Sequence, residues 1–588
     1  MGDALDRALG LDDPRSLERL RRLLWLLAVA LGAFSAWASR YEMDPDGPSY
    51  IGIAEAYCRG DWLHALSAYW SPLYSWCIGA AMSLVHPSPY WEYPLVHAIN
   101  FGVYLIALAC FEFLLRQCAA WSECQAAAGD EAGRNGSGLA RSVWLLLGYA
   151  LFLQSSLVWI SSNLVTPDLL VEALLFLAAG LLLRLRTNAP AYLTYLALGA
   201  VLGLGYLAKT AVFPLALVFL GASPFVAPGS AGKRLSGVLL GIAAFLVVSV
   251  PFIVAISVVK GRPTIGDTAS LNYDWCVNGR ERPICYELPG LAHPPRKVLD
   301  RPVVVYYFPL PRSQRGYLDW SYWCEGERPY FSLRNQAVTL VHSAAVYWTL
   351  VTRSVGFLYF YLLALLALPS GARLRRGTIL GGWPLLLPAV AGLGMYALVL
   401  VDPRYVAPLL VLLWLGLYLG VSTRTIGEGG VRFLARAGVA LMACVLLAIC
   451  RVEAKNAASV VRAALRGQGA TAHTYWTAAQ ALRRLGCGPG STLAWAGPGT
   501  GQVARLARVR LVAPIPDLTE AVTWEGKPMA PVADALRRVG VTAILASDVL
   551  PRLARGGWHR LGDTDYYAYM LTAPGPASGP GALREHGR

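Results

Sequence analysis

The chain has 588 residues, of which 56% are hydrophobic and only 15% are charged. Soluble domains carry roughly 25% charged residues, and the mean hydropathy of +0.46 likewise indicates an integral membrane protein. The net charge of +15 could suggest a nucleic-acid partner, but the arginines gather in short loops between apolar runs. They form no basic stripe interleaved with aromatic residues. We therefore exclude nucleic acid as a partner and expect a chain embedded in a membrane.

The apolar runs predict a mainly α, polytopic transmembrane helix bundle. Residues 1–22 are polar and basic, and we expect them to form a cytoplasmic N-terminus ahead of the first apolar run, Leu23–Ala38. Segments of about 18–25 apolar residues are long enough to cross a bilayer. We expect about eleven spans in all, the later ones near residues 91–117, 142–161, 166–184, 190–208, 211–227, 235–259, 354–371, 378–401, 404–422 and 435–451.

The distribution of positive charge predicts the orientation of these spans. Lysine and arginine concentrate in cytoplasmic loops. With the N-terminus inside, every inner loop is rich in arginine, whereas the short outer turns hold isolated cations, namely Arg40, Arg59, Lys209 and Arg404. If one span were added or removed, all later arginine-rich loops would lie outside the membrane, against the usual distribution of positive charge. The N-terminus is therefore expected in the cytoplasm, and the region after the last span outside it.

Two long outer loops interrupt the transmembrane domain, which we place at residues 23–451. Residues 40–90 are rich in Trp and Tyr and too polar to cross a bilayer. They predict amphipathic interfacial helices on the membrane surface, one over residues 49–58 and one from Pro72. Residues 260–353 form the second outer loop, which ends in an interfacial helix over residues 333–352.

Residues 452–572 predict a small α/β domain outside the membrane. Strand-like runs at 492–496, 509–512, 541–546 and 566–571 alternate with helix-like runs at 502–508 and 531–539. Residues 573–588 are rich in Pro and Gly and predict a disordered tail. The segment Gly497–Gln502 resembles a phosphate-binding loop, but Gln502 stands where such a loop needs lysine. We therefore expect only a tight turn between a strand and a helix.

Cys276 and Cys285 lie close together in the second outer loop. An oxidising exterior permits a disulfide between them. Two free thiols agree equally well with the cysteine count and spacing. The sequence leaves both alternatives open.

Charged side chains gather at the outer ends of several spans, where ionisable groups in a membrane protein mark candidate functional sites. Asp168 opens the fourth span, Lys209 ends the fifth, Arg353 precedes the eighth, and Arg404 with Tyr405 opens the tenth. Each residue has a structural alternative: helix capping for Asp168, snorkelling for Lys209 and interfacial anchoring for Arg353. Their placement on one face favours a shared site.

This set of residues suits the displacement of a phosphate leaving group. Cations neutralise the phosphate while a carboxylate takes the proton from the attacking hydroxyl. Asp46 is the candidate base, on a loop turned by Pro45 and Gly47 and followed by Tyr50, another candidate site residue. Asp44 competes with it, and a simple turn would explain both acids. Asp46 and Asp168 are also candidate ligands for a divalent cation.

Short motifs carry a resemblance to a known enzyme class. The following segments resemble those of GT-C class glycosyltransferases and occur in the same order: Asp46-Gly-Pro-Ser-Tyr50, Gly60-Asp-Trp62, Ser71-Pro-Leu-Tyr74, Thr166-Pro-Asp168, Gly203–Lys209 and Pro403-Arg-Tyr405. The similarity is greatest to the family 39 type, which includes protein O-mannosyltransferases and the aminoarabinose transferases of lipid A. Protein O-mannosyltransferases usually have Glu after the first-loop Asp, so Gly47 disfavours that subfamily.

The resemblance implies an inverting glycosyltransferase in a bacterial inner membrane, with a polyprenyl-phosphate sugar as donor and a lipid, glycan or protein as acceptor. By the same resemblance, Asp46 is the catalytic carboxylate and Asp168 the second acid, while Lys209 and Arg404 bind the donor phosphate. A polyprenyl-linked glycan transporter is the main alternative, although transporters usually place polar residues midway across broken helices. A glycan ligase or polymerase is the second alternative, and the sequence identifies neither sugar nor acceptor.

Overall fold

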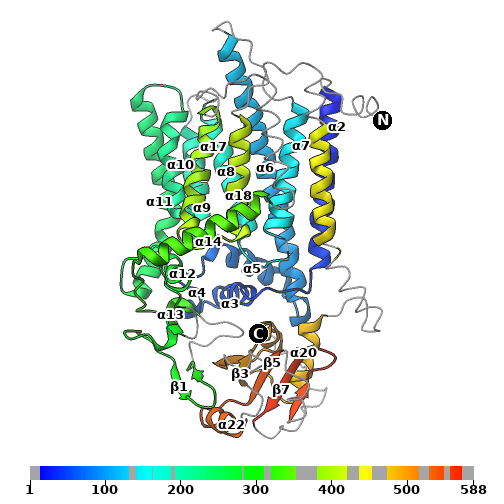
Figure 1. Cartoon of the computed structure of the whole chain (residues 1–588), viewed down its shortest axis with the longest axis vertical. Coiled ribbons are helices and arrows are strands. Elements are labelled where there is room, and N and C mark those ends of the chain that lie inside the picture. The colour runs from blue at the N-terminus through cyan, green and yellow to red at the C-terminus, as the bar shows by residue number, and fades with distance from the viewer. Residues whose placement is uncertain are drawn as a thin grey trace.

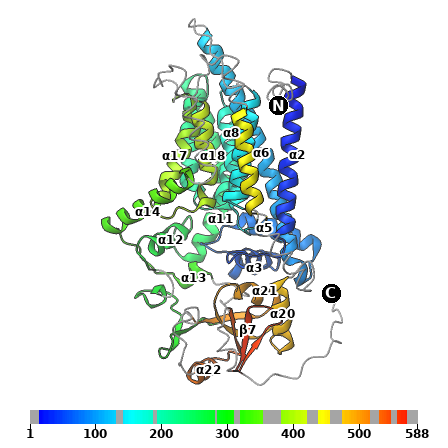
Figure 2. The same cartoon turned by 45° about the vertical axis from the view of Figure 1, so that its right-hand side comes forward.

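A bundle of long apolar helices stands on a smaller C-terminal domain in the computed structural model (Figure 1). The structure describes residues 14–130, 141–161, 163–186, 192–280, 284–309, 319–352, 380–419, 436–452, 454, 473–515, 529–547 and 557–571. Short helices from the two outer loops lie between the bundle and the domain, and the two views agree on this order (Figure 2).

The bundle is built from helices that follow the predicted spans closely. Four described helices are long and apolar enough to cross a membrane, and shorter apolar helices accompany them. Its helices are α2 (Pro14–Ala38), α6 (Glu92–Asp130), α7 (Arg141–Gln154), α8 (Asp168–Arg184), α9 (Tyr192–Ala208), α10 (Val212–Val226), α11 (Ala231–Lys260), α17 (Trp383–Ala397) and α18 (Pro403–Leu419). Residues 436–452 are also helical and pack on α7, where Gly438 lies against Leu146.

The predicted N-terminal tail and the predicted span at 354–371 differ from the other segments in how the structure describes them. Helix α2 begins at Pro14, so residues 14–22 are helical and not a separate tail. Glu18 explains this extension, because it pairs with Arg21 and Arg22 at the spacing that stabilises helices. The span predicted at 354–371 lies outside the described residues, as does the tail at 573–588, and the count of about eleven spans stays a prediction.

The first outer loop forms α3 (Gly47–Cys58), α4 (Trp62–Ala65) and α5 (Pro72–Val85). Helix α5 begins at Pro72 as predicted, α3 begins two residues before the predicted start, and α4 was not predicted. The exposed polar face expected of an amphipathic α3 is not seen, and its position relative to the membrane stays a prediction. Nine of its twelve residues are buried between α5 and the C-terminal domain. Gly52, Ala54 and Ala56 give α3 no bulky polar face, so neighbouring helices can close over it on several sides.

The second outer loop contributes α12 (Thr268–Cys276), α13 (Trp320–Trp323) and α14 (Leu333–Thr352). The predicted bounds of α14 are confirmed, and it crosses the bundle obliquely (Figures 1 and 2). Val341 and Trp348 are exposed on one side, while Gln336 and Ser343 donate hydrogen bonds to carbonyls at the end of α17. This two-sided character is typical of an interfacial helix. The side chain of Cys285 lies outside the described residues, so its pairing with Cys276 stays open.

The C-terminal domain is a mixed α/β fold, as predicted. Its five-stranded sheet has the order β4-β3-β5-β7-β6, with β3 parallel to β4 and β5, and β7 antiparallel to β5 and β6. The elements are α20 (Thr474–Arg484), β3 (Thr492–Ala496), α21 (Thr500–Ala507), β4 (Arg510–Pro514), α22 (Met529–Arg538), β5 (Ala543–Ser547), β6 (Trp558–Arg560) and β7 (Tyr566–Met570). Sequence reasoning missed α20 and the short β6.

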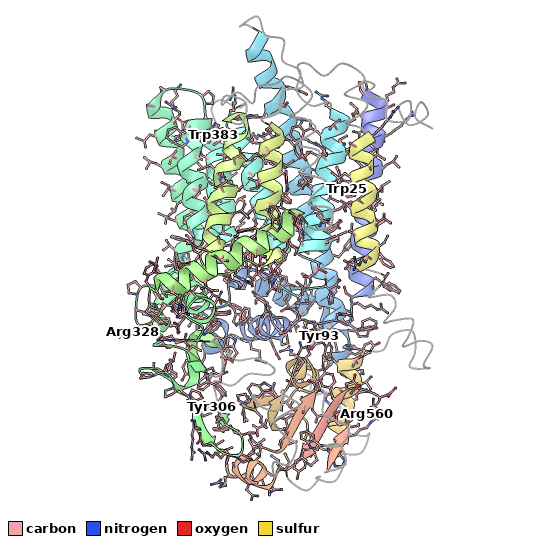
Figure 3. The ribbon with its side chains drawn as sticks, viewed as in Figure 1. Trp25, Tyr93, Tyr306, Arg328, Trp383 and Arg560 are labelled. Carbon is pink, nitrogen blue, oxygen red and sulfur yellow. The ribbon has the colours of Figure 1, made fainter. Side chains whose placement is uncertain are left out.

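A hairpin from the second outer loop joins this domain to the rest of the chain. Strands β1 (Arg296–Leu299) and β2 (Val305–Tyr307) are antiparallel, and Tyr306 on β2 is marked in Figure 3. The Phe308 N–H donates to the Val512 carbonyl of β4 at 2.7 Å. Val305 is buried against the sheet. The loop and the domain therefore form one packed unit outside the bundle.

Candidate functional site

The loop between α2 and α3 carries both acids predicted in the first outer region. Asp44 Oδ1 accepts a hydrogen bond from the Val165 N–H at 2.7 Å, and its Oδ2 accepts from the Asp46 N–H at 3.1 Å. Burial, and next the negative charge of Asp46, raise the pKa of Asp44 to about 7. Both carboxylate oxygens of Asp44 are thus engaged by backbone, and the residue ties the loop to the segment that precedes α8.

Little space surrounds Gly47, the residue after Asp46. A Cβ at this position would collide with Met43 Sδ and lie 3.1 Å from Val165 Cβ. A larger residue at this position would therefore require Met43 to move. The close approach of Met43 fixes the loop just before α3 begins.

Asp168 is the first residue of α8, and its side chain is only 3% exposed. Pro167 occupies the N-cap position, so Asp168 does not serve as the helix cap. Its Oδ1 accepts from Lys209 Nζ at 2.7 Å, and its Oδ2 accepts from Thr166 Oγ1 at 2.8 Å. A buried carboxylate needs partners of this kind to offset its desolvation.

Arg404 connects the two acids. Its Nη2 lies 3.4 Å from Asp46 Oδ2, and its Nη1 lies 3.8 Å from Asp168 Oδ2. Lys209 Nζ lies 3.4 Å from the ring centroid of Tyr405, so it faces an aromatic ring and a carboxylate instead of snorkelling outward. We name Asp46, Asp168, Lys209 and Arg404 the charge cluster.

The charge cluster forms one wall of a cavity of about 460 Å³. Tyr50 and Tyr405 line the same cavity near the cluster. Much of the remaining lining is apolar and comes from α10, α12 and the end of α17, including Phe213, Leu217, Ala269, Met395 and Val399. The cavity therefore combines a charged cluster with a largely apolar lining, as an amphipathic ligand with an anionic head requires.

A divalent cation at Asp46 and Asp168 does not fit this arrangement. The Arg404 guanidinium contacts both carboxylates and stands where a shared ion would lie. Among the described residues no group of three or more His, Cys, Asp or Glu side chains converges at metal-binding distance. Sites for Mg²⁺ or Ca²⁺ need several oxygen ligands. We therefore derive no chemical step through a metal, and metal dependence stays a prediction to be tested.

Most of the predicted site residues converge in this cavity. Asp46, Asp168, Lys209 and Arg404 form its charged wall, and Tyr50 and Tyr405 also line it. Asp44 supports the loop instead of lining the cavity, and Arg353 lies outside the described residues. Sequence reasoning missed Asp402, whose Oδ1 accepts from the Arg404 N–H at 3.0 Å. Its position two residues before Arg404, in the Asp402-Pro-Arg404 turn, could have identified Asp402 from the sequence.

The fold resembles that of GT-C membrane glycosyltransferases. A crystal structure of the Archaeoglobus fulgidus oligosaccharyltransferase, in complex with Zn and sulfate, matches with a TM-score of 0.51 and 12% identity over 90% of this chain and 68% of that chain. ArnT from Cupriavidus metallidurans bound to undecaprenyl phosphate matches with a TM-score of 0.49 and 14% identity over 94% and 99% of the two chains. No family model and no curated protein matches the sequence. The match to the oligosaccharyltransferase, at 12% identity, shows a shared fold and nothing finer.

Proposed function

We propose that this protein is an inverting glycosyltransferase that uses a polyprenyl-phosphate sugar as donor. The acceptor is a hydroxyl group of a lipid, glycan or protein at the outer face of the membrane. The observation that carries the proposal is the charge cluster in the lining of a largely apolar cavity. A polyprenyl phosphate has the same two-part chemistry, because a long apolar chain ends in an anionic phosphate.

The cations in the cluster suit the leaving phosphate. Lys209 is held by Asp168 at 2.7 Å, and Arg404 is held between Asp46 and Asp168. Fixed positive charges of this kind stabilise negative charge as it develops on a leaving group, with little reorganisation. In this scheme Asp168 positions Lys209 and Arg404, and these two residues contact the phosphate.

Asp46 suits the role of general base. Its side chain is 35% exposed, compared with 3% for Asp168, and its contact with Arg404 is long at 3.4 Å. It can therefore receive the proton of an acceptor hydroxyl as that oxygen bonds to the anomeric carbon. The bond from this carbon to the phosphate oxygen breaks in the same displacement, and the sugar configuration inverts. The phosphate leaves as polyprenyl phosphate.

The test uses membranes that contain the full chain and their endogenous acceptors. We expect one member of a panel of radiolabelled undecaprenyl-phosphate sugars, offered singly, to transfer its label to a membrane or envelope fraction. Membranes without the protein serve as the control. A protein that moves the labelled lipid between leaflets without forming any product would contradict transfer and favour the transporter.

We also propose that the protein lies in a bacterial inner membrane with its N-terminus in the cytoplasm. The start of α2 lies at the end of the bundle opposite the C-terminal domain (Figure 1), which supports this orientation. Inner loops rich in arginine support it independently. We expect an alkaline phosphatase fused after Arg451 to be active outside the cell and one fused near Arg375 to be inactive. Activity of the second fusion would contradict the orientation.

A further inference from the structure

A helix of the C-terminal domain contacts the loop that carries Asp46. Gln502 on α21 donates from Nε2 to the Met43 carbonyl at 3.1 Å, and Tyr475 on α20 donates from Oη to the same oxygen at 3.4 Å. Met43 precedes Asp46 by three residues. Gln502 and Met43 are both buried, so the contact is shielded from water. Two donors from the outer domain thus converge on one carbonyl of the proposed catalytic loop.

Gln502 is itself held in place from the bundle side. Tyr93, near the start of α6, donates from Oη to the Gln502 carbonyl at 2.8 Å. Tyr93 is fully buried, and Figure 3 marks it at the junction between the helices and the C-terminal domain. The hydrogen bond from Tyr93 therefore holds the backbone of Gln502 against α6, while the side chain of Gln502 contacts Met43. A buried hydrogen bond between two fixed partners restricts both of them.

Arg505, one turn further along α21, anchors the helix that begins right after Asp46. Its guanidinium is 0% exposed and lies 2.7 Å from Glu55 on α3 and 3.2 Å from Glu92 on α6. Arg508 also pairs with both acids. Burial alone would raise the pKa of Glu55, but Arg505, Arg59 and Arg508 hold that pKa below its usual value. Separating these charges while they stay buried is costly, so α3 and α21 keep one relative position.

The turn before α21 explains the glycine-rich segment that resembles a phosphate loop. Gly497 and Gly499 adopt φ values of +83° and +74°, which side chains other than glycine rarely accept. Helix α21, which follows this turn, lies beside α3 (Figure 2). Gln502 stands where a phosphate-binding loop needs lysine, and its side chain instead donates the hydrogen bond to the Met43 carbonyl.

We infer that α21 positions the catalytic loop, with Gln502 and Arg505 as positioning residues for Asp46. The inference rests on the proposed function. Gln502 fixes the loop before Asp46, Arg505 fixes α3 after it, and Asp44 fixes the same loop from the α8 side. Displacing a reacting group by about 1 Å can cost roughly 10²-fold in rate. The C-terminal domain is therefore part of the catalytic unit.

Gln502→Met tests this inference, because it removes the donor and keeps the length of the side chain. In the purified full chain we expect kcat to fall by roughly 10- to 100-fold, with little change in KM for the labelled donor selected above. Binding of undecaprenyl phosphate should be unchanged, because Gln502 does not line the cavity. Hydrogen exchange of residues 43–50 should accelerate, while exchange in β3 and β5 should not.

The control is Asp534→Asn, an exposed position on α22 that we expect to behave as wild type. Should Gln502→Met fail to fold, Tyr475→Phe removes the second donor to the Met43 carbonyl and should give a smaller fall in kcat. Wild-type kcat in the folded variants would overturn the inference, even if Asp46→Asn is inactive. Loss of undecaprenyl phosphate binding in Gln502→Met would also overturn it. An active Asp46→Asn variant would instead refute the role of Asp46 as the base, and a wild-type protein that forms no product would refute the proposed function. In both cases the exchange measurement would still report the contact.

Discussion

Replacement of Asp46 by Asn is expected to abolish sugar transfer while leaving expression and donor binding intact. A positioned base typically contributes 10²–10⁴-fold to a rate, and Asn has nearly the same shape but cannot accept the proton. The carboxylate lies 3.4 Å from Arg404 and lines the cavity, so the change removes one charge without opening a void. The measurement is single-turnover transfer from the labelled donor, with undecaprenyl phosphate binding measured in parallel.

Asp44→Asn is the matched control, two residues away on the same loop. Asn keeps one side-chain oxygen that can accept from the Val165 N–H, so most of the support for the loop should survive. We expect a milder loss than for Asp46→Asn, and a loss that includes some stability. If Asp44→Asn were the more damaging change for turnover at equal stability, the roles of the two acids would have to be exchanged. An Asp46→Asn enzyme with normal turnover would remove the base from the mechanism altogether.

The local elements were predictable because each has a strong sequence signal. Pro72 opens α5 at the predicted residue, Thr492–Ala496 is a strand as its apolar run predicts, and Leu333–Thr352 is the predicted interfacial helix. Asp168, Lys209 and Arg404 could be grouped because ionisable residues of a membrane span mark candidate functional sites and the predicted orientation placed these three on one face. Periodicity and charge placement were sufficient for that grouping.

The contacts between distant segments could not be predicted in the same way. Arg505 and Glu92 are separated by more than four hundred residues and meet as a buried pair. An arginine on a short helix is most often solvated, and nothing near either residue in the sequence identifies the partner. The burial of α3 was missed for a related reason, because part of its cover is α21, which contacts the first outer loop through Gln502 and Arg505.

Replacement of Lys209 by Met is expected to weaken donor use far more than folding. Lys209 Nζ lies on the wall of the cavity, where the proposed phosphate would contact it. A charge-assisted hydrogen bond contributes about 1.5–3 kcal/mol, which corresponds to a loss of roughly 10- to 150-fold in affinity for the donor. Asp168 keeps Thr166 at 2.8 Å and Arg404 at 3.8 Å, so its carboxylate is not left without partners.

The double variant Lys209→Met with Asp168→Asn separates the effect of Lys209 on donor use from its effect on stability. Removing both charges should recover any stability lost in Lys209→Met, because no buried carboxylate then lacks its main partner. It should not recover donor use, because the phosphate still lacks its cation. Arg404→Gln is expected to be at least as damaging to turnover, since Arg404 contacts Asp46 as well as Asp168. Wild-type turnover of both Lys209→Met and Arg404→Gln would show that these residues only anchor the chain at the membrane surface.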